Sequence, residues 1–399
     1  MTRTRTALII GGGIAGPATA MALRKAGLDA VVYEARPTGA DGIGAFLTLA
    51  SNGVDALRVL DADAPVLAAG FPTPGITLRS GTGRYLGRTR TGRTLPDGTT
   101  SQSITRAALY GALHDEARAR GVRVEYGRRL VDAQDTGTGI RAVFADGSDA
   151  LGDILIGCDG IHSTVRRIID PAAPAPTYTG LTTTGGYARG VAVDTEPGSY
   201  EMIFGRRAFF GYAAASRDEV WWFANLPQRR EPSTDALRAV GGDQRRRRLL
   251  ELFADDAGPA VPLITATPET MPMSAIHCVG HLPTWWRGRM IVIGDAAHAP
   301  SPTSGQGASL SIEDAVVLAT CLRDQPDSAA AFARYEQARR PRVERIVRWA
   351  SRINNSKAAG PVGRALRDAM LPRLLRLTAD SSTQRQLYDY HIDWDAAVA

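Results

Sequence analysis

The chain of 399 residues is poor in cysteine, with three, and contains only two lysines. Apart from Lys25 and Lys357, its positive charge rests on arginine, which argues against an enzyme that forms a Schiff base on lysine. Cys158, Cys278 and Cys321 stand apart among apolar or small residues and form no Cys-x-x-Cys pair. This usage indicates buried thiols in a reducing compartment, with neither a disulfide framework nor a metal site.

Long apolar runs are also absent from the sequence. No stretch approaches the roughly 18–20 uncharged apolar residues that a membrane-spanning helix needs. The N-terminal segment MTRTRTALIIGGG is too short in its apolar part to be a signal peptide. We therefore expect a cytoplasmic protein without stable membrane insertion.

The net charge of +6 comes from 47 basic and 41 acidic residues. The arginines are dispersed, and the one dense run, residues 245–248, predicts the solvated face of a helix. No basic patch is interleaved with aromatic residues, as single-strand nucleic-acid binding would require. The charge thus argues against a nucleic-acid partner and favours a modest attraction for anionic substrates.

The chain begins with a strand–helix–strand pattern. Residues 6–10 predict a strand, 17–27 a helix and 29–37 a second buried strand. In so short a stretch this pattern makes a βαβ unit with two parallel strands. Further along, Ser51 and Asn52 predict the capped start of another helix.

The middle of the chain changes in character. Residues 75–100 are rich in Gly, Thr and Arg and predict hairpins or a loop. Between 174 and 275, strands rich in Phe, Tyr and Trp predict an antiparallel sheet, with a helix inserted at 234–256. From residue 309 to about residue 378 the pattern is helical.

A glycine motif lies between the first strand and the first helix. Gly11, Gly13 and Gly16 form G-x-G-x-x-G around Ala15, and Glu34 ends the second strand. Such glycines let the backbone approach a pyrophosphate at the positive end of a helix, while the acid accepts hydrogen bonds from a ribose. Because strand, helix, second strand and acid are all in place, we predict a dinucleotide site. This motif alone does not separate NAD from FAD.

Two further segments distinguish an FAD site from an NAD site: GCDGIHSTVR (157–166) and GRMIVIGDAAHAPSPTSGQGASLSIEDA (288–315). With the glycine loop, they supply three fingerprints in family order and spacing. On these segments the chain resembles the single-component FAD-dependent aromatic hydroxylases and monooxygenases related to p-hydroxybenzoate hydroxylase. It looks closest to compact tetracycline-inactivating and salicylate-type members, which lack a C-terminal thioredoxin-like domain.

The resemblance implies an α/β fold, in which a Rossmann-like FAD-binding domain carries an inserted substrate domain with a mixed or antiparallel sheet, followed by C-terminal helices. The expected boundaries are 1–75, 100–173 and 276–325 for the discontinuous FAD-binding domain, 76–99 and 174–275 for the substrate domain, and 326–399 for the helical segment. The last helices would pack across both domains, although their apolar and arginine pattern also suits a membrane-surface helix.

The resemblance also assigns FAD contacts to the third fingerprint. Asp295 would hydrogen-bond the ribityl chain from the end of its strand, and Pro302 would approach the reactive edge of the flavin. A helix N-terminus would lie against the isoalloxazine, formed by Gly305, Gln306, Gly307 and Ala308. Such a terminus favours the negative charge that reduced flavin carries near N1 and its C2 carbonyl.

Four more residues are implied at the cofactor. Asp159 of the second fingerprint is linked in the family to both FAD and the nicotinamide coenzyme. Arg106, in SITRAAL, would lie beside the ribityl or pyrophosphate group, Arg36 would flank the adenosine, and Leu130 would offer backbone contacts near the adenine. Asp159 also suits a capped turn, and each arginine alone is an ordinary residue at the end of an element.

The chain departs from the family at two places. Thr48 stands where the tetracycline-inactivating relatives carry an acid, so that flavin contact is not expected here. The segment GYARG lacks a tryptophan common in the family, which implies an altered, wider pocket. Candidate lining residues are the aromatic Tyr187, Phe210, Tyr212 and Trp222. Alternation places Trp222 on the opposite face from Trp221 and Phe223, so only some of these aromatics can line it. No catalytic base is assigned, and His298 is expected to be packed.

The activity implied is that of an FAD-dependent monooxygenase, an oxidoreductase consuming NADPH or NADH. Its flavin would form a C4a-hydroperoxide with molecular oxygen and hydroxylate or epoxidise an aromatic or polycyclic small molecule, as in secondary metabolism. Two alternatives stay open: a flavoprotein on the same scaffold that transfers no oxygen, and a catalytically idle protein that binds flavin or another ligand. We expect a monomer or a weak homodimer.

Overall fold

Strand β1 (Thr6–Ile10) lies inside a six-stranded sheet in the computed structural model, which describes residues 6–39, 45–357, 360–378 and 382–398. β2 (Asp29–Glu34) and β12 (Ile154–Gly157) flank it in parallel. The remaining strands are β8 (Arg123–Tyr126), β19 (Met290–Val292) and the antiparallel β18 (Trp286–Arg287). The predicted βαβ unit is therefore confirmed, with β1 buried almost throughout, as a strand between covered faces must be.

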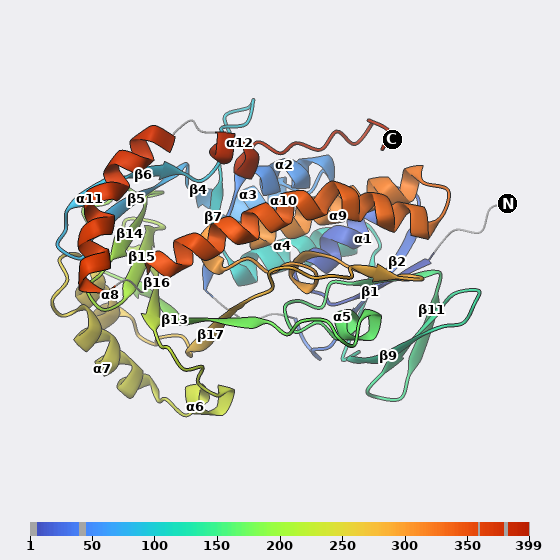
Figure 1. The fold of residues 1–399 in the computed structure, drawn as a ribbon, viewed down its shortest axis with the longest axis horizontal. Helices are drawn as coiled ribbons and strands as arrows, with labels where there is room; N and C mark the ends of the chain where they lie inside the picture. Colours follow the sequence, from blue (N-terminus) through green and yellow to red (C-terminus); the bar gives the residue numbers. More distant parts are fainter. Residues whose placement is uncertain (1–5, 40–44, 358–359, 379–381, 399) are drawn as a thin grey trace.

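Helices pack against this sheet and against one another (Figure 1). They are α1 (Ala15–Lys25), α2 (Ser51–Val59), α3 (Ala64–Ala69), α4 (Arg106–Ala119), α5 (Thr164–Ile169) and α9 (Gly307–Asp324). The predicted cap at Ser51 and Asn52 is wrong, because Ala50 is the N-cap of α2 and caps it with no side chain. Asn52 instead points into the protein and is fully buried.

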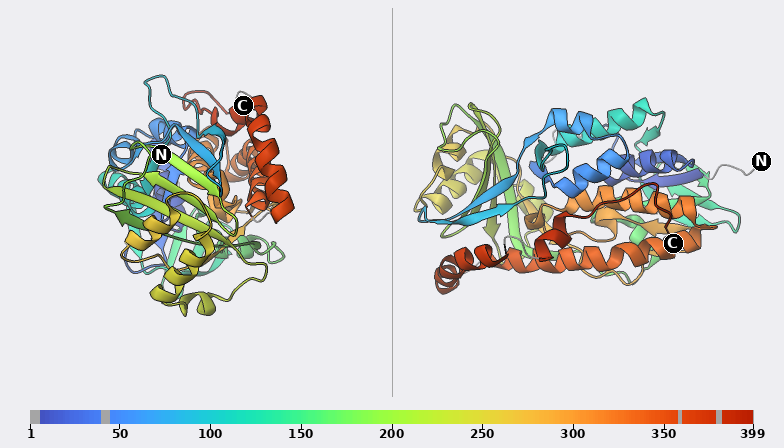
Figure 2. Two further views of the ribbon diagram at one scale, coloured as in Figure 1. Left: turned by 90° about the vertical axis from the view of Figure 1, so that its left-hand side faces the viewer. Right: turned by 90° about the horizontal axis from the view of Figure 1, so that it is seen from above.

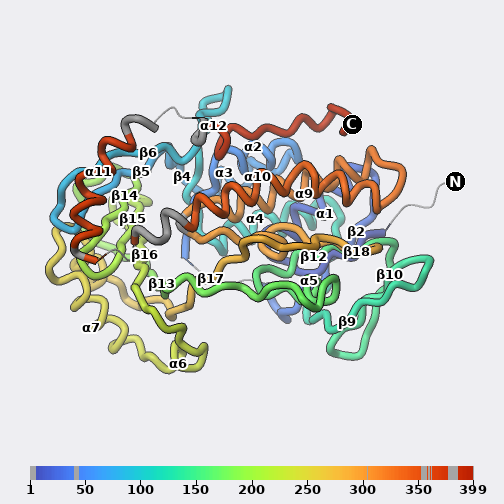
Figure 3. The backbone as a smooth tube through the Cα atoms, in the orientation of Figure 1, coloured from blue at the N-terminus to red at the C-terminus, as the bar shows by residue number. Residues whose placement is uncertain are grey.

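Two small sheets join the six-stranded sheet and its helices, and together they make up the first of two bodies of the molecule. β9 (Leu130–Asp135), β10 (Ile140–Phe144) and β11 (Asp149–Gly152) form an antiparallel meander. β3 (Phe46–Leu49), β4 (Phe71–Pro72) and β7 (Gln102–Thr105) form the second sheet, which leads from this first body toward a second one. Figure 3 shows the chain crossing between the two bodies several times, so neither body is one continuous segment.

A seven-stranded mixed sheet forms the second body. Its order is β17 (Ser274–Cys278), β13 (Thr177–Arg189), β16 (Glu219–Pro227), β15 (Phe209–Ala214), β14 (Tyr200–Phe204), β5 (Gly75–Ser80) and β6 (Tyr85–Arg90). All neighbours are antiparallel except β14 and β5. The hairpin of β5 and β6 lies within the Gly, Thr and Arg-rich stretch, and the mixed sheet confirms the predicted fold class.

Three helices follow β16: α6 (Thr234–Arg238), α7 (Gly242–Phe253) and α8 (Ala260–Ala266). The single helix predicted at 234–256 is thus two helices, with extended backbone at Gly241 between them. The predicted solvated arginine run is also partly wrong. Arg245 is buried and donates to the Thr270 carbonyl oxygen and hydroxyl at 2.6 and 2.8 Å, because it closes α7 onto the loop before β17.

The C-terminal helices are α10 (Ser328–Ser356), α11 (Pro361–Thr378) and α12 (Ser382–Tyr388). α10 spans both bodies, as expected, and is seen along its length in Figure 2. α11 packs Leu371 and Leu375 onto the large sheet, yet its outer side exposes a row of large apolar residues: Val362, Leu366, Met370 and Leu374. Within the described part of the chain, no helix is both long and apolar enough to cross a bilayer.

Candidate functional site

The glycine loop after β1 is packed on one side and open on the other. A Cβ on Gly11, whose φ is +104°, would lie 2.4 Å from the Cys158 carbonyl oxygen, and one on Gly16 would lie 2.0 Å from the Gly11 carbonyl oxygen. A Cβ on Gly13 would meet no atom within 4 Å. Gly11 and Gly16 therefore let the loop pack against its neighbours, whereas Gly13 leaves free space above the loop.

That free space lies at the N-terminus of α1. Ile14 is the N-cap, no side chain caps the helix, and its first turn contains no acidic residue. The first amide groups of a helix lack intrahelical partners and carry partial positive charge. The loop and the helix start, including the buried Ala15, are thus suited to a pyrophosphate.

Glu34, at the end of β2, holds the loop in place. Its Oε2 accepts the Gly12 amide at 2.7 Å and its Oε1 accepts the Arg36 amide at 2.9 Å. A carboxylate has about four acceptor positions, so Glu34 retains capacity for ribose hydroxyls. The Arg36 side chain is exposed beside it, and Leu130 is buried at the start of β9.

His114 is a residue of this site that the sequence analysis missed. From α4 its Nε2 donates to the Gly12 carbonyl oxygen at 2.6 Å, and its ring stacks on Tyr110 with centroids 3.9 Å apart. Burial lowers the pKa of His114, although the Gly12 carbonyl opposes that effect. A histidine within the apolar face of a predicted helix was the available signal, since a buried imidazole needs a partner.

Asp159 stabilises the turn in which it lies, before α5. Its carboxylate accepts the Ser163 hydroxyl at 2.5 Å and the amides of Thr164 and Val165 at 2.7 and 3.1 Å. The nearby Arg166 is buried and donates to the Ala296 carbonyl oxygen at 2.9 Å. The second fingerprint thus caps α5, and the hydrogen bond from Arg166 to Ala296 joins it to the third fingerprint. The structure supports the capping interpretation of Asp159.

Asp295 differs from Asp159 in having no hydrogen bond from another described residue. It follows β19, and its Oδ1 would lie 3.6 Å from a Cβ on Gly307, at the start of α9. Burial raises its pKa, while the positive charge of Arg106 opposes that rise. A half-buried carboxylate without protein donors keeps part of its desolvation cost, and the hydroxyls of a ribityl chain are donors that would satisfy it.

The loop before α9 presents a second uncapped helix start. Pro302–Ser304 form a short 3-10 turn, Gly305 has a φ of +61°, and Gln306 is the N-cap without a side-chain cap. Gly307 begins the helix, Ala308 follows half-buried, and the first turn contains no acid. Seven of the residues assigned to FAD therefore lie at two helix starts that no side chain caps, each beside a carboxylate: Gly13, Ala15, Gly16, Gly305, Gln306, Gly307 and Ala308.

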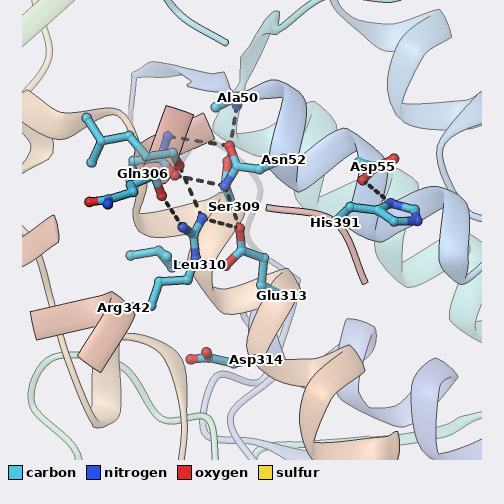
Figure 4. A network of polar contacts seen from close by, with 12 residues as sticks. Ala50, Asn52, Asp55, Gln306, Ser309, Leu310, Glu313, Asp314, Arg342 and His391 are labelled. Atoms are coloured by element: carbon cyan, nitrogen blue, oxygen red, sulfur yellow. Dashed lines mark hydrogen bonds and ion pairs between the residues drawn. The ribbon is translucent and has the colours of Figure 1, made fainter. Parts of the chain in front are cut away.

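A buried polar network holds the second helix start in place (Figure 4). Asn52 Nδ2 donates to Gln306 Oε1 at 3.0 Å and to Glu313 Oε1 at 2.6 Å. Glu313 also pairs with Arg342 at 2.8 Å and with the fully buried Arg339 at 2.7 Å. These two arginines hold the pKa of Glu313 below its usual range despite burial.

Asp314, the next residue, fixes the start of the loop. It accepts the Gly294 amide at 2.9 Å, the His298 ring at 2.6 Å and Arg339 at 2.7 Å. His298 is buried, so the expectation that it is packed holds. Adjacent residues Glu313 and Asp314 thus anchor the two ends of the segment from Gly294 to Gln306.

One face of the seven-stranded sheet carries aromatic side chains toward β3. Phe46, on β3, has its ring centroid 5.6 Å from Trp221 and 6.0 Å from Phe223. Tyr187 contacts Trp221 edge-on at 6.0 Å. This face, with Thr48 half-exposed on the same short strand, is the structural candidate for a substrate surface.

Three of the four predicted pocket residues do not lie on that face. Phe210, Tyr212 and Trp222 are almost fully buried on the other side, in a core with residues of α7 and α8. Phe210 stacks on Trp222 at 5.5 Å, and the Trp222 indole donates to the Thr267 hydroxyl at 2.7 Å. The expectation for these three is corrected, because strand alternation turns them away from Trp221 and Phe223.

The described residues therefore fit FAD. Gly13 and the first turn of α1 would receive the pyrophosphate, Glu34 the ribose, and Asp295 and the start of α9 the flavin half. Arg106 is exposed at the start of α4, within electrostatic reach of Asp295. Among the described residues, no cluster of three or more His, Cys, Asp or Glu side chains could hold a metal ion.

Comparisons with known proteins find FAD-dependent relatives. A family model described as an FAD binding domain matches residues 4–350. The chain is 32% identical over 357 residues to the aurachin C monooxygenase/isomerase of Stigmatella aurantiaca, covering 87% of this chain and 88% of that protein. It is 31% identical over 356 residues to an FAD-dependent urate hydroxylase of Klebsiella pneumoniae, covering 86% and 87%. The solved structure of Klebsiella pneumoniae HpxO complexed with FAD and uric acid matches with a TM-score of 0.81 at 26% identity, over 95% of this chain and 97% of that chain.

Proposed function

The chain belongs to the FAD-binding-domain family and is an FAD-dependent monooxygenase, and on that premise we propose that it uses NADH or NADPH and molecular oxygen to hydroxylate or epoxidise an aromatic or polycyclic small molecule. The observation that carries the proposal is Asp295, a half-buried carboxylate that receives no hydrogen bond from another described residue and lies beside the uncapped start of α9. That pair matches the hydroxyl-rich chain and the anion-forming ring of a flavin.

When bound, FAD would take reducing equivalents from the nicotinamide and activate oxygen. The protein then has to bind and orient FAD and the substrate, and to exclude water from the site. The amides at the start of α9 favour negative charge on the adjacent ring by roughly 0.3–2 kcal/mol. Preorganised amides in a dry site add to this stabilisation. The Asn52–Glu313 network keeps these amides in position.

The substrate class is supported by the aromatic face of the large sheet. Trp221, Phe223 and Tyr187 present flat apolar surfaces toward β3, and such surfaces pair well with aromatic rings. Two relatives are named for urate and aurachin C as their substrates. We propose that this chain, too, takes a flat ring system on this face.

The nicotinamide is proposed to bind transiently. The sequence has one G-x-G-x-x-G loop, and the free space above Gly13 supports the proposal that this loop holds FAD. A second dinucleotide therefore has no dedicated fingerprint, which suits a co-substrate that binds, reacts and leaves. Whether it is NADH or NADPH is decided by titration.

The test begins with the purified protein and its visible spectrum. NADH and NADPH are then titrated under air with phenols, quinolones, urate and polycyclic compounds, and oxygen-18 gas is used with any compound that accelerates oxidation. The proposal expects a yellow protein, substrate-stimulated NAD(P)H oxidation and labelled product. Stimulated oxidation with unlabelled product would indicate a non-oxygenating oxidoreductase, and bound FAD without stimulation by any compound would indicate an idle binding protein.

A further inference from the structure

Lys357, one of the two lysines of the chain, is buried at the junction between the bodies. It directly follows α10, and its Nζ donates to Asn225 Oδ1 at 2.7 Å. The ammonium lies 4.0 Å from the ring centroid of Phe209 and 5.8 Å from that of Phe223. The proposed function makes no use of this group.

Its surroundings place the amine on the aromatic face. Asn225 lies two residues beyond Phe223 on β16, hence on the same side of the strand. Asn225 Nδ2 donates to the Thr183 hydroxyl at 3.1 Å, so its carbonyl oxygen is turned to Lys357. The Phe223 ring packs directly on Gly211, since a Cβ on Gly211 would lie 2.4 Å from that ring. The amine thus stands at the edge of a surface made of ring faces.

Lys357 has no counter-charge among the residues that the structure describes. Lys25, by contrast, is partly exposed and pairs with Asp61 at 3.1 Å. A buried ammonium that contacts one amide oxygen and two rings keeps much of its desolvation cost, because none of these partners is an anion. Burial is the cause that lowers the pKa of Lys357 to about 7.

A structural role alone accounts poorly for this arrangement. If the side chain only tied the end of α10 to β16, an uncharged donor would form the same hydrogen bond without the charge penalty. An ammonium has three donors, and Asn225 uses one of them. The remaining donors and the uncompensated charge suit an acidic oxygen that arrives with a ligand.

We propose that Lys357, oriented by Asn225, binds the ionisable oxygen of the substrate, and that the substrate is therefore an aromatic or heteroaromatic compound with an acidic phenol, enol or ring-oxo group. This rests on the proposed function. The anion supplies the missing counter-charge, while the attached ring packs on the face formed by Phe223 and Trp221. Lys357 is thus a substrate-positioning residue.

The test uses FAD-loaded protein and matched probe pairs: 4-hydroxy-2-quinolone, 2-naphthol and 4-nitrophenol, each with its O-methyl ether. Dissociation constants are read from the perturbation of the flavin absorbance in wild type, Lys357→Met and Lys357→Gln. Lys25→Met, which removes the other lysine from the surface, is the control. We expect wild type to prefer the ionisable member of at least one pair, and both Lys357 variants to lose about tenfold or more for that member alone.

Equal weakening of a compound and its ether in a Lys357 variant would indicate a structural role and overturn the proposal. An absent preference in wild type across all three pairs would overturn it as well. Because two substitutions are compared, a misfolded Lys357→Met protein leaves Lys357→Gln to decide. These results are distinct from failure of the proposed function, which appears as a wild-type protein that binds no FAD or shows no NAD(P)H oxidation.

Discussion

Asn52 donates a hydrogen bond of 2.6 Å to Glu313, although 261 positions separate the two residues in the chain. The bond joins the first turn of α2 to the first two turns of α9. Through the same amide, Asn52 also contacts Gln306, the N-cap of α9. The position of the proposed flavin site therefore depends on a pair of residues that carries no cofactor chemistry itself.

Glu313→Gln is expected to destabilise the protein strongly. It would leave Arg339 and the partly buried Arg342 with one carboxylate fewer, and breaking a buried pair costs on the order of 3–5 kcal/mol. Chemical denaturation monitored by tryptophan fluorescence measures the change. Glu336→Gln is the control, because its partner Arg340 is partly exposed and such pairs contribute about 0–1 kcal/mol. Similar losses in both variants would contradict the buried network.

Asp295→Ala and Asp159→Ala are expected to fail in different ways. Removing Asp295 relieves a half-buried charge that receives no hydrogen bond from another described residue, so the apoprotein keeps its stability while the FAD dissociation constant rises about tenfold or more. Removing Asp159 takes away three hydrogen bonds from the turn before α5, at a cost of about 1–3 kcal/mol or more. Apoprotein melting and FAD titration separate the two. An Asp295→Ala apoprotein that melts well below wild type would count against the assignment.

The glycine loop offers a matched pair of substitutions. Gly13→Ala should fold as wild type, since its Cβ meets no protein atom within 4 Å, but the methyl enters the space proposed for the pyrophosphate and weakens FAD binding. Gly11→Ala should be unstable even without FAD, because of the contact with Cys158 and a φ of +104°. Circular dichroism melts and flavin fluorescence give both readouts. Tight FAD binding by Gly13→Ala would place the cofactor elsewhere.

Lys357 should make stability depend on pH between about 7 and 10. Burial lowers its pKa from 10.5 to about 7, so in this window the unfolded chain holds a proton that the folded chain has released. Stability then rises with pH, by at most about 1.4 kcal/mol per pH unit. The difference in unfolding free energy between wild type and Lys357→Met isolates this contribution from the tyrosines and cysteines. A difference that stays constant from pH 7 to 9 would show that the lysine titrates normally.

Trp221 and Trp222 are neighbours with opposite expected roles. Trp222→Phe removes the hydrogen bond to Thr267 and repacks the core beneath α7 and α8, so we expect a loss of about 1–3 kcal/mol with little change in substrate affinity. Trp221→Phe alters the face toward β3 and should change KM more than stability. Steady-state kinetics on the identified substrate and thermal melts together test the pair. An unchanged KM in Trp221→Phe would remove this face from the proposed pocket.

The parts of the fold that the sequence predicts well depend on neighbours along the chain. Gly11 and Gly16 mark the turn because only glycine accepts that packing, and period-two alternation separates Trp222 from Trp221. The prediction failed where one helix became two at Gly241, and where Phe210 and Tyr212 were grouped with Tyr187. Alternation divides a strand into two faces but does not say which face meets the other body.

The sequence by itself determined the βαβ unit, the three fingerprints and the alternation of the aromatic strands, because each follows from local backbone geometry. Only the tertiary structure decided that Asn52 meets Glu313, that His114 holds the glycine loop, and that Lys357 lies on Phe209 with no counter-charge from any residue that the structure describes. The desolvation of a charge is a property of everything packed around it. Residues far apart in the chain supply that packing, so no local pattern reveals it.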